Sequence, residues 1–217
     1  MHVSFPILET LVLDNLKNLE HICIGTLSIT FGSLGVIKVK NCVQLKYLFS
    51  FTLVKELSHL SEIEVCQCNS MKEIVLGDNN SSANSTTNEN IEVFLFRSLT
   101  LEHLETLQNF FSRSEQNHQL LEPYVSTPLF NAQVAFPNLD ALKLSSLNLN
   151  KIWDDNHQSM CNLTSLIVES CAELKYLFLS TMVGSFKNLK HLEISNCPLM
   201  EEIIAKEENN NEMEEVW

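Results

Sequence analysis

One spacing of apolar residues occurs seven times along the 217 residues of the chain, and this repetition limits the possible folds more than any other feature. The pattern is L-x-x-L-x-L-x-x-(L or C)-x-x-L-x-x-L, in which other apolar residues can replace leucine. The copies that begin at Leu8, Leu34 and Leu60 are spaced by 26 residues, as are those at Leu163 and Leu189. The two central residues of the copies are Leu11 and Leu13, Ile37 and Val39, Ile63 and Val65, Leu99 and Leu101, Leu142 and Leu144, Leu166 and Val168, and Leu192 and Ile194.

The central x-L-x-L-x segment of each copy predicts a β-strand with one buried face, because buried and outward residues alternate in it. The later apolar residues of a copy turn the chain back beneath its strand. One such coil cannot bury its own apolar face, whereas stacked coils share a core and pair their strands in parallel. The pattern therefore predicts an α/β leucine-rich-repeat solenoid of about seven repeats. The parallel sheet should line the concave side, with short helical turns on the convex side around residues 52–57 and 181–186.

A second, longer period indicates that half of the chain duplicates the other half. The segment 40–65 recurs as 169–194, and MKEIV at 71–75 recurs as MEEII at 200–204, each with an offset of 129 residues. Repeats one to three therefore correspond to repeats five to seven. The fifth repeat departs from the pattern after Leu147, where we expect Leu149 and Ile152 to be buried instead.

Two insertions and an acidic tail interrupt this periodicity and divide the chain. The Asn/Ser-rich insertion GDNNSSANSTTNEN and the insertion around Pro123, Tyr124 and Pro128 are either tolerated surface loops or loops beside a binding face. The predicted divisions are repeats one to three at 1–76, a flexible insertion at 77–93, repeat four at 94–110, an insertion at 111–135, repeats five to seven at 136–206 and the acidic tail at 207–217.

The charge and composition argue against several classes of function. A net charge of −13 disfavours nucleic-acid binding, which requires a cationic surface. No apolar run approaches the roughly 18 residues of a membrane span, and no signal peptide is evident at the start of the chain. Without a signal peptide, the seven cysteines indicate free thiols in a reducing compartment. The repeats begin almost at once, which suggests a fragment of a longer chain or a truncated product. A repeat array with uncovered ends should also aggregate.

No motif in the sequence indicates catalysis, a cofactor or a metal. Four cysteines, Cys42, Cys68, Cys171 and Cys197, occupy the same repeat position just after the strand. We interpret them as an interior column that satisfies backbone groups where the chain turns, because stacking separates them by whole coils. Cys66 and Cys68 form C-x-C, which is not half of a zinc site. The chain also lacks H-E-x-x-H, G-x-S-x-G and the phosphate-binding G-x-x-x-x-G-K-[ST], so we expect no enzyme.

The remaining candidate surface consists of outward positions on the concave face of the predicted sheet. Lys38 and Lys40 lie next to Glu62 and Glu64 in the predicted stacking. Two interpretations stay open: these charges pair across strands and stabilise the sheet modestly, or they contact a partner. The full set of candidate partner-binding residues is Lys38, Lys40, Glu62, Glu64, Glu102, Lys143, Glu169, His191 and Glu193.

Several phrases resemble the leucine-rich-repeat region of plant intracellular nucleotide-binding immune receptors of the coiled-coil type. They are FPILETLVLDNLKNLEHI, NCVQLKYLFS, CNSMKEIV, STPLFNAQVAFPNLDALKLSSLNLNKIW and NCPLMEEII. The resemblance implies disease-resistance roles in sensing pathogen effectors and in autoinhibition. The implied partners are a pathogen effector or host guardee, and the nucleotide-binding domain of the same receptor. The implied location is the cytoplasm or nucleus. The resemblance does not imply nucleotide binding, because the chain has no phosphate-binding loop.

Two other readings remain beside the immune-receptor one. Substrate receptors of F-box-type ubiquitin ligases also carry cysteine after the strand of their repeats. The chain could alternatively be a truncated decoy or scaffold without signalling domains. An extracellular receptor ectodomain is disfavoured, because its repeats of about 24 residues, its G-x-I-P phrase and its capping cysteine pairs are missing.

Overall fold

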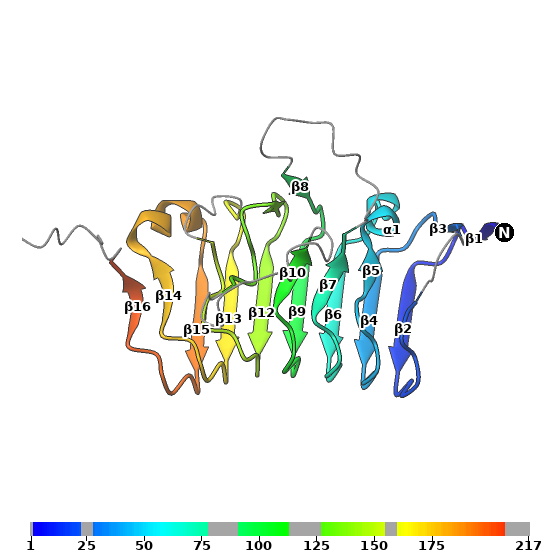
Figure 1. Ribbon diagram of the computed structural model, residues 1–217. Helices are drawn as coiled ribbons and strands as arrows, with labels where there is room; N and C mark the ends of the chain where they lie inside the picture. The colour runs from blue at the N-terminus through cyan, green and yellow to red at the C-terminus, as the bar shows by residue number, and fades with distance from the viewer. Residues whose placement is uncertain (1, 23–27, 78–90, 113–126, 155–159, 207–217) are drawn as a thin grey trace, which may run out of the picture.

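The computed structural model describes residues 2–22, 28–77, 91–112, 127–154 and 160–206 of the chain. Its main feature is a parallel sheet of seven strands that follow one another in chain order (Figure 1). Each strand comes from one copy of the repeat, as the alternation of apolar residues predicted. The strands are β2 (Thr10–Asp14), β4 (Val36–Lys40), β6 (Glu62–Cys66), β9 (Ser98–Glu102), β12 (Ala141–Ser145), β13 (Ser165–Glu169) and β15 (His191–Ser195).

The register of this sheet is the same across every pair of neighbouring strands. Leu11 lies opposite Ile37, Ile37 opposite Ile63, and the row continues without a slip to Leu192. The repeat template therefore predicted the strand positions and their pairing to the residue. Because side chains alternate along a strand, this common register sends all the leucine positions to one face of the sheet.

A turn with left-handed backbone geometry ends every strand of the sheet. The residue after each strand has a positive φ between 52° and 57°, although none of the seven is glycine. The N–H of the turn residue in one repeat donates to the last carbonyl of the next strand, as Asn15 does to Lys40 at 2.9 Å and Gln67 does to Glu102 at 3.0 Å. This bond offsets the cost of the left-handed geometry. The seven turn residues are Asn15, Asn41, Gln67, His103, Ser146, Ser170 and Asn196.

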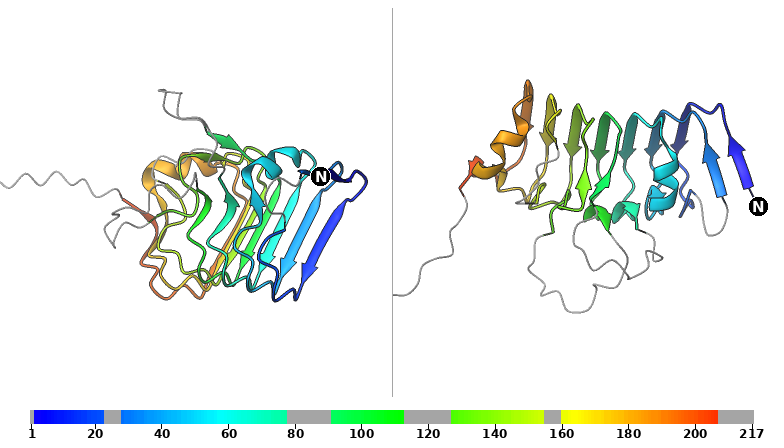
Figure 2. Two further views of the ribbon diagram at one scale, coloured as in Figure 1. Left: turned by 45° about the vertical axis from the view of Figure 1, so that its right-hand side comes forward. Right: turned by 90° about the horizontal axis from the view of Figure 1, so that it is seen from above.

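Besides the main sheet, the described residues form short strands, loops and two helical turns (Figure 2). The helical turns are α1 (Phe51–Glu56) and the 3-10 helix η2 (Ser180–Phe186), which confirms the turns expected around 52–57 and 181–186. The short strands also pair in parallel. They are β1 (His2–Phe5) with β3 (Ser28–Phe31), β7 (Glu73–Leu76) between β5 (Phe49–Ser50) and β10 (Asn109–Ser112), β8 (Glu92–Val93) with β11 (Val134–Ala135), and β14 (Tyr176–Leu179) with β16 (Glu202–Ala205).

The core runs from repeat to repeat between the main sheet and these outer elements. Repeats two to six bury the template residues almost completely, and Leu149 and Ile152 of the irregular fifth repeat are buried as expected. Aromatic rings fill the part of the core away from the main sheet. Phe110 and Phe136 meet edge to face with ring centroids 5.0 Å apart, and Trp153 stacks on Phe130 at 5.4 Å. Full burial of each such side chain contributes about 1.5–3 kcal/mol.

The first and last repeats are less buried than the template predicts. Leu11 is half-buried and Leu192 is 39% exposed, whereas Leu166 at the same template position is fully buried. The reason is that a terminal repeat has a neighbour on one side only among the described residues. The insertions predicted at 77–93 and 111–135 lie largely outside the described residues, and the tail predicted at 207–217 lies wholly outside them. Of these ranges the structure describes only 77, 91–93, 111–112 and 127–135.

Candidate functional site

The outward positions of the seven-stranded sheet form one continuous open face. Each strand contributes three outward residues, and the common register arranges them in three rows across the sheet. The central row runs Val12, Lys38, Glu64, Thr100, Lys143, Ile167 and Glu193. All nine candidate residues predicted from the sequence lie on this face, which we call the open face. They do not form one cluster but fall into separate groups along it.

The first group is centred on Lys38, which lies between two glutamates of the neighbouring strand. Its Nζ is 2.7 Å from Oε1 of Glu62 and 3.0 Å from Oε2 of Glu64. The two hydrogen bonds raise the pKa of Lys38 to about 12. All three side chains remain about 40% exposed, so water screens the ion pairs and their contribution to stability is small. Cross-strand charge pairing, one of the two interpretations left open by the sequence, is therefore present at Lys38.

Lys40 is outside this pairing, although its spacing suggested the same role. It lies in register with Cys66, and no described carboxylate forms an ion pair with it. Strand alternation puts Cys66 at an outward position of β6, but the structure leaves it only 8% exposed. Burial, followed by the nearby charge of Glu102, raises the pKa of the Cys66 thiol. Lys40 is thus an exposed cation beside a covered thiol.

A second ion pair joins the two strands in the middle of the sheet. Nζ of Lys143 on β12 contacts Oε1 of Glu102 on β9. The hydrogen bond from Lys143 to Glu102 raises the pKa of Lys143. Glu102 on β9 thus has Lys143 of β12 on one side and Cys66 of β6 on the other.

The third group lies on the last two strands of the sheet. Nε2 of His191 is 3.5 Å from Oε2 of Glu193 on the same strand, and both side chains are more than half exposed. Glu169 on β13 lies in register with Ser145 and Ser195, which carry no charge. The open face is therefore acidic toward this end.

The four cysteines after the strands have a structural role, as the repeat pattern indicated. Sγ of Cys42 donates to the carbonyl of Lys40 at 3.4 Å, and Cys68, Cys171 and Cys197 make the equivalent bond two residues back. Burial raises the pKa of Cys68 and Cys171 to about 11, so these thiols stay protonated. Within the described parts of the chain, no group of three or more His, Cys, Asp or Glu side chains is placed to hold a metal ion.

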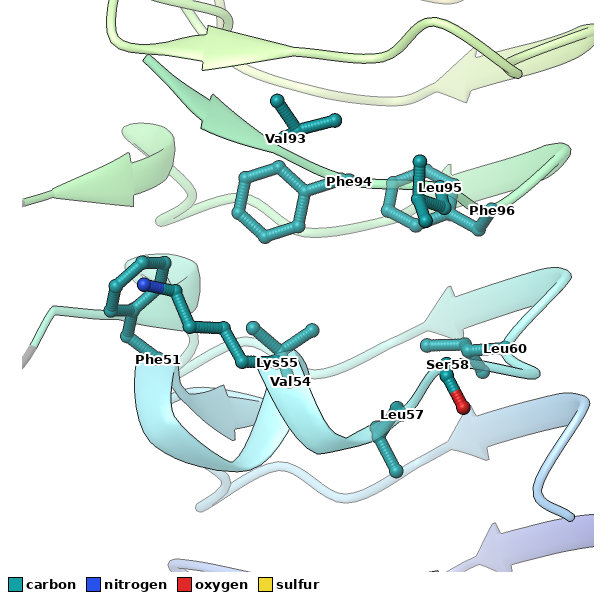
Figure 3. A pocket seen from close by; sticks show the side chains of 10 residues that line it. All are labelled: Phe51, Val54, Lys55, Leu57, Ser58, Leu60, Val93, Phe94, Leu95 and Phe96. Atoms are coloured by element: carbon teal, nitrogen blue, oxygen red, sulfur yellow. The ribbon is translucent and has the colours of Figure 1, made fainter. Parts of the chain in front are cut away.

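A small pocket lies away from the predicted residues, between α1 and residues 93–96 (Figure 3). Its volume is about 170 Å³ and its lining is largely apolar, with Phe51 and Val54 on one side and Val93 to Phe96 on the other. Lys55 spans the rim, where its Nζ lies 3.9 Å from the centre of the Phe51 ring and 3.6 Å from Oε2 of Glu92. None of the nine candidate residues lines this pocket.

No helix in the described residues has the length and apolar character to cross a membrane.

Comparison with known proteins gives one family. The chain has no significant match among curated proteins or among solved structures. Residues 7–122 and 138–216 match the family model described as "Plant disease resistance protein RPS2-like, leucine-rich repeats". This match covers most of the chain and agrees with the in-register parallel strands, so the chain belongs to the leucine-rich repeats of the RPS2-like plant disease resistance proteins.

Proposed function

We propose that the chain is the protein-recognition module of a plant intracellular immune receptor, and that its open face contacts the partner. The partner is a pathogen effector or a host protein guarded by the receptor. In the resting receptor, the same module holds the nucleotide-binding domain inactive. The module acts in the cytoplasm or nucleus.

The observation that carries this proposal is the open face itself. Apart from the buried Cys66 and Ser145, its side chains are displayed by paired strands and contribute little to the core, so they are free to differ between receptors without loss of the fold. Repeat proteins bind through extended surfaces of this kind, where many repeats each supply a few contacts. We further propose that the repeats form a curved solenoid in which the open face is concave.

The charge pattern of the open face indicates where specificity arises. The ion pairs of Lys38 and Lys143 partly neutralise the charge on the central strands of the open face. Lys40 at one end and Glu193 at the other are exposed charges of opposite sign. A partner with an acidic group facing Lys40 and a basic group facing Glu193 would be complementary to the open face.

Site-specific photo-cross-linking in plant cells tests this proposal. A photoreactive residue replaces Thr100 in the middle of the open face, and the matched control replaces the exposed Lys175 outside that face. We expect a discrete protein cross-link from position 100 that depends on the matching effector or on the receptor's own nucleotide-binding domain. Addition of Lys40→Glu should weaken that cross-link. It should change the free energy of unfolding by less than about 0.5 kcal/mol, because the residue is exposed. Equal cross-linking from positions 100 and 175 would contradict the proposal.

A further inference from the structure

The pocket between α1 and residues 93–96 lies in the middle of the chain and is separate from the open face (Figure 3). The lining residues that belong to the core are at most 6% exposed, and they are Leu57, Leu60, Phe94 and Phe96. At the opening, Val93 and Leu95 are more than half exposed. The pocket is therefore an apolar hollow that the core supports on one side and that opens to solvent on the other.

The pocket lies where α1 interrupts a row of short outer strands. β1 and β3 pair just before the first and second repeats, and β8 and β11 pair just before the fourth and fifth. In the third repeat α1 takes this place, and a helix does not pair with the edge of a strand. The N–H groups of Glu92 and Phe94 donate to β11 at 2.7 and 2.9 Å. Because backbone groups alternate in direction along a strand, the N–H of Val93 points away from β11, to the side on which α1 lies.

Lys55 places one positive charge at the opening of the pocket. Its Nζ lies 3.9 Å from the centre of the Phe51 ring and 3.6 Å from Oε2 of Glu92, and its side chain is 57% exposed. The contact with the Phe51 ring holds the ammonium beside the pocket. An ammonium has three N–H donors, so the single long contact with Glu92 leaves donors for a bound anion.

The internal duplication shows that this cation and its ring are not part of the repeat framework. The segment that contains α1 recurs 129 residues later as the segment that contains η2. Ser180 and Gly184 stand there at the positions of Phe51 and Lys55. A helical turn at this place in the repeat therefore needs neither side chain, and the pair is a feature of the pocket beside α1.

The volume of the pocket sets the size of the group that it can hold. A volume of about 170 Å³ is close to that of a cavity of roughly 150 Å³ that takes up one benzene molecule. The pocket therefore has room for one six-membered ring. Its apolar lining favours a ring without polar substituents, and Lys55 favours a carboxylate next to that ring.

We propose that this pocket binds a small organic acid made of one apolar ring and one carboxylate. The ring lies against Leu57, Leu60 and Phe94, and the carboxylate accepts a hydrogen bond from Nζ of Lys55. The N–H of Val93 is a second donor on the same side. None of the nine residues of the proposed protein-binding surface lines the pocket, so the module has a separate site for a small molecule.

Titration of the 217-residue chain with 3-phenylpropanoate tests the proposal, and its neutral amide, 3-phenylpropanamide, is the matched probe without charge. Nuclear magnetic resonance follows the methyl signals of Val54, Val93 and Leu95, which line the pocket. Val183 on η2 is the control signal, because it is 42% exposed but lies in the duplicated segment. A ligand of this size should bind with a dissociation constant on the order of millimolar.

Two lysine variants separate the role of the charge from that of the ring. Lys55→Met keeps the apolar stem and removes the cation, and Lys187→Met is the control at an exposed lysine directly after η2. We expect the unmodified chain to bind the acid about two- to fivefold more tightly than the amide, because an exposed ion pair contributes modestly. Lys55→Met should bind both probes equally, at the level of the amide, and Lys187→Met should behave like the unmodified chain. Circular dichroism checks that each variant is folded.

Three results would overturn the proposal. The first is the absence of a saturable shift of the pocket methyl signals at concentrations well above millimolar, or an equal shift of Val183. The second is equal binding of acid and amide by the unmodified chain. The third is a preference for the acid that survives in Lys55→Met or disappears in Lys187→Met, because the charge of Lys55 would then not select the ligand.

Discussion

Truncation of the same template leucine in two different repeats should have very different costs. Leu166 and Leu192 lie opposite each other in neighbouring strands, but Leu166 is fully buried and Leu192 is 39% exposed. Leu166→Ala removes a side chain that is covered by repeats on both sides and leaves a cavity, which costs about 2–5 kcal/mol. The side chain of Leu192 is only roughly three-fifths buried, and its removal leaves no closed cavity. We therefore expect Leu192→Ala to lower the free energy of unfolding by about 1 kcal/mol.

Urea unfolding followed by circular dichroism measures this difference. The expected result is a shift of the unfolding midpoint that is at least twice as large for Leu166→Ala as for Leu192→Ala. Equal costs would refute the reasoning, because they would mean that the last repeat is as fully packed as an internal one.

Three further predictions concern the turns, the cysteines and the open face. Gln67→Val should lower the thermal midpoint while Gln67→Asn preserves it, because a β-branched residue tolerates a φ of 56° poorly. Among the six cysteines that the structure describes, mass spectrometry after alkylation at pH 8 should find the exposed Cys161 modified first, and Cys68 and Cys171 modified only after unfolding, because burial keeps them protonated. Lys38→Met should reduce the free energy of unfolding slightly at pH 8. The pKa of Lys38 is raised on folding from 10.5 to about 12, so its contribution is complete below pH 10.5 and disappears as the pH rises through 12. Urea unfolding at pH 8 and above pH 12 measures this change, and a difference between Lys38→Met and the unmodified chain that persists above pH 12 would contradict it.

The sequence predicted the main sheet because its information is local and periodic. Each strand occupies the x-L-x-L-x segment of its repeat, and one template fixes the register of all seven. The cysteine column was predictable for the same reason, since Cys42 and its counterparts always follow the strand at the same interval. The repeat spacing placed Lys38 beside Glu62 and Glu64, but it left open whether these charges pair across the strands or contact a partner.

Other features depend on contacts that the template does not contain. The aromatic cluster includes Phe94, Phe130 and Trp153, which lie outside the regular leucine positions and meet only in the folded chain. The raised pKa of the Cys66 thiol owes part of its shift to Glu102, which lies in register with it although 36 residues away in the sequence. The exposure of Leu192 depends on its lack of a described neighbour and not on its own sequence context.

The open face exists only if seven strands share one sheet with a single register, and distances between spin labels test this most directly. One label is placed at Val12 on β2, and a second at Thr100, Ile167 or Glu193 on the open face. Labels carried by non-natural amino acids leave the cysteines intact, and an excess of unlabelled chain removes distances between copies. With about 4.8 Å between strands, three, five and six steps across the sheet give about 14, 24 and 29 Å. Distances that rise in this order would confirm the sheet, whereas distances that do not follow strand order would contradict it.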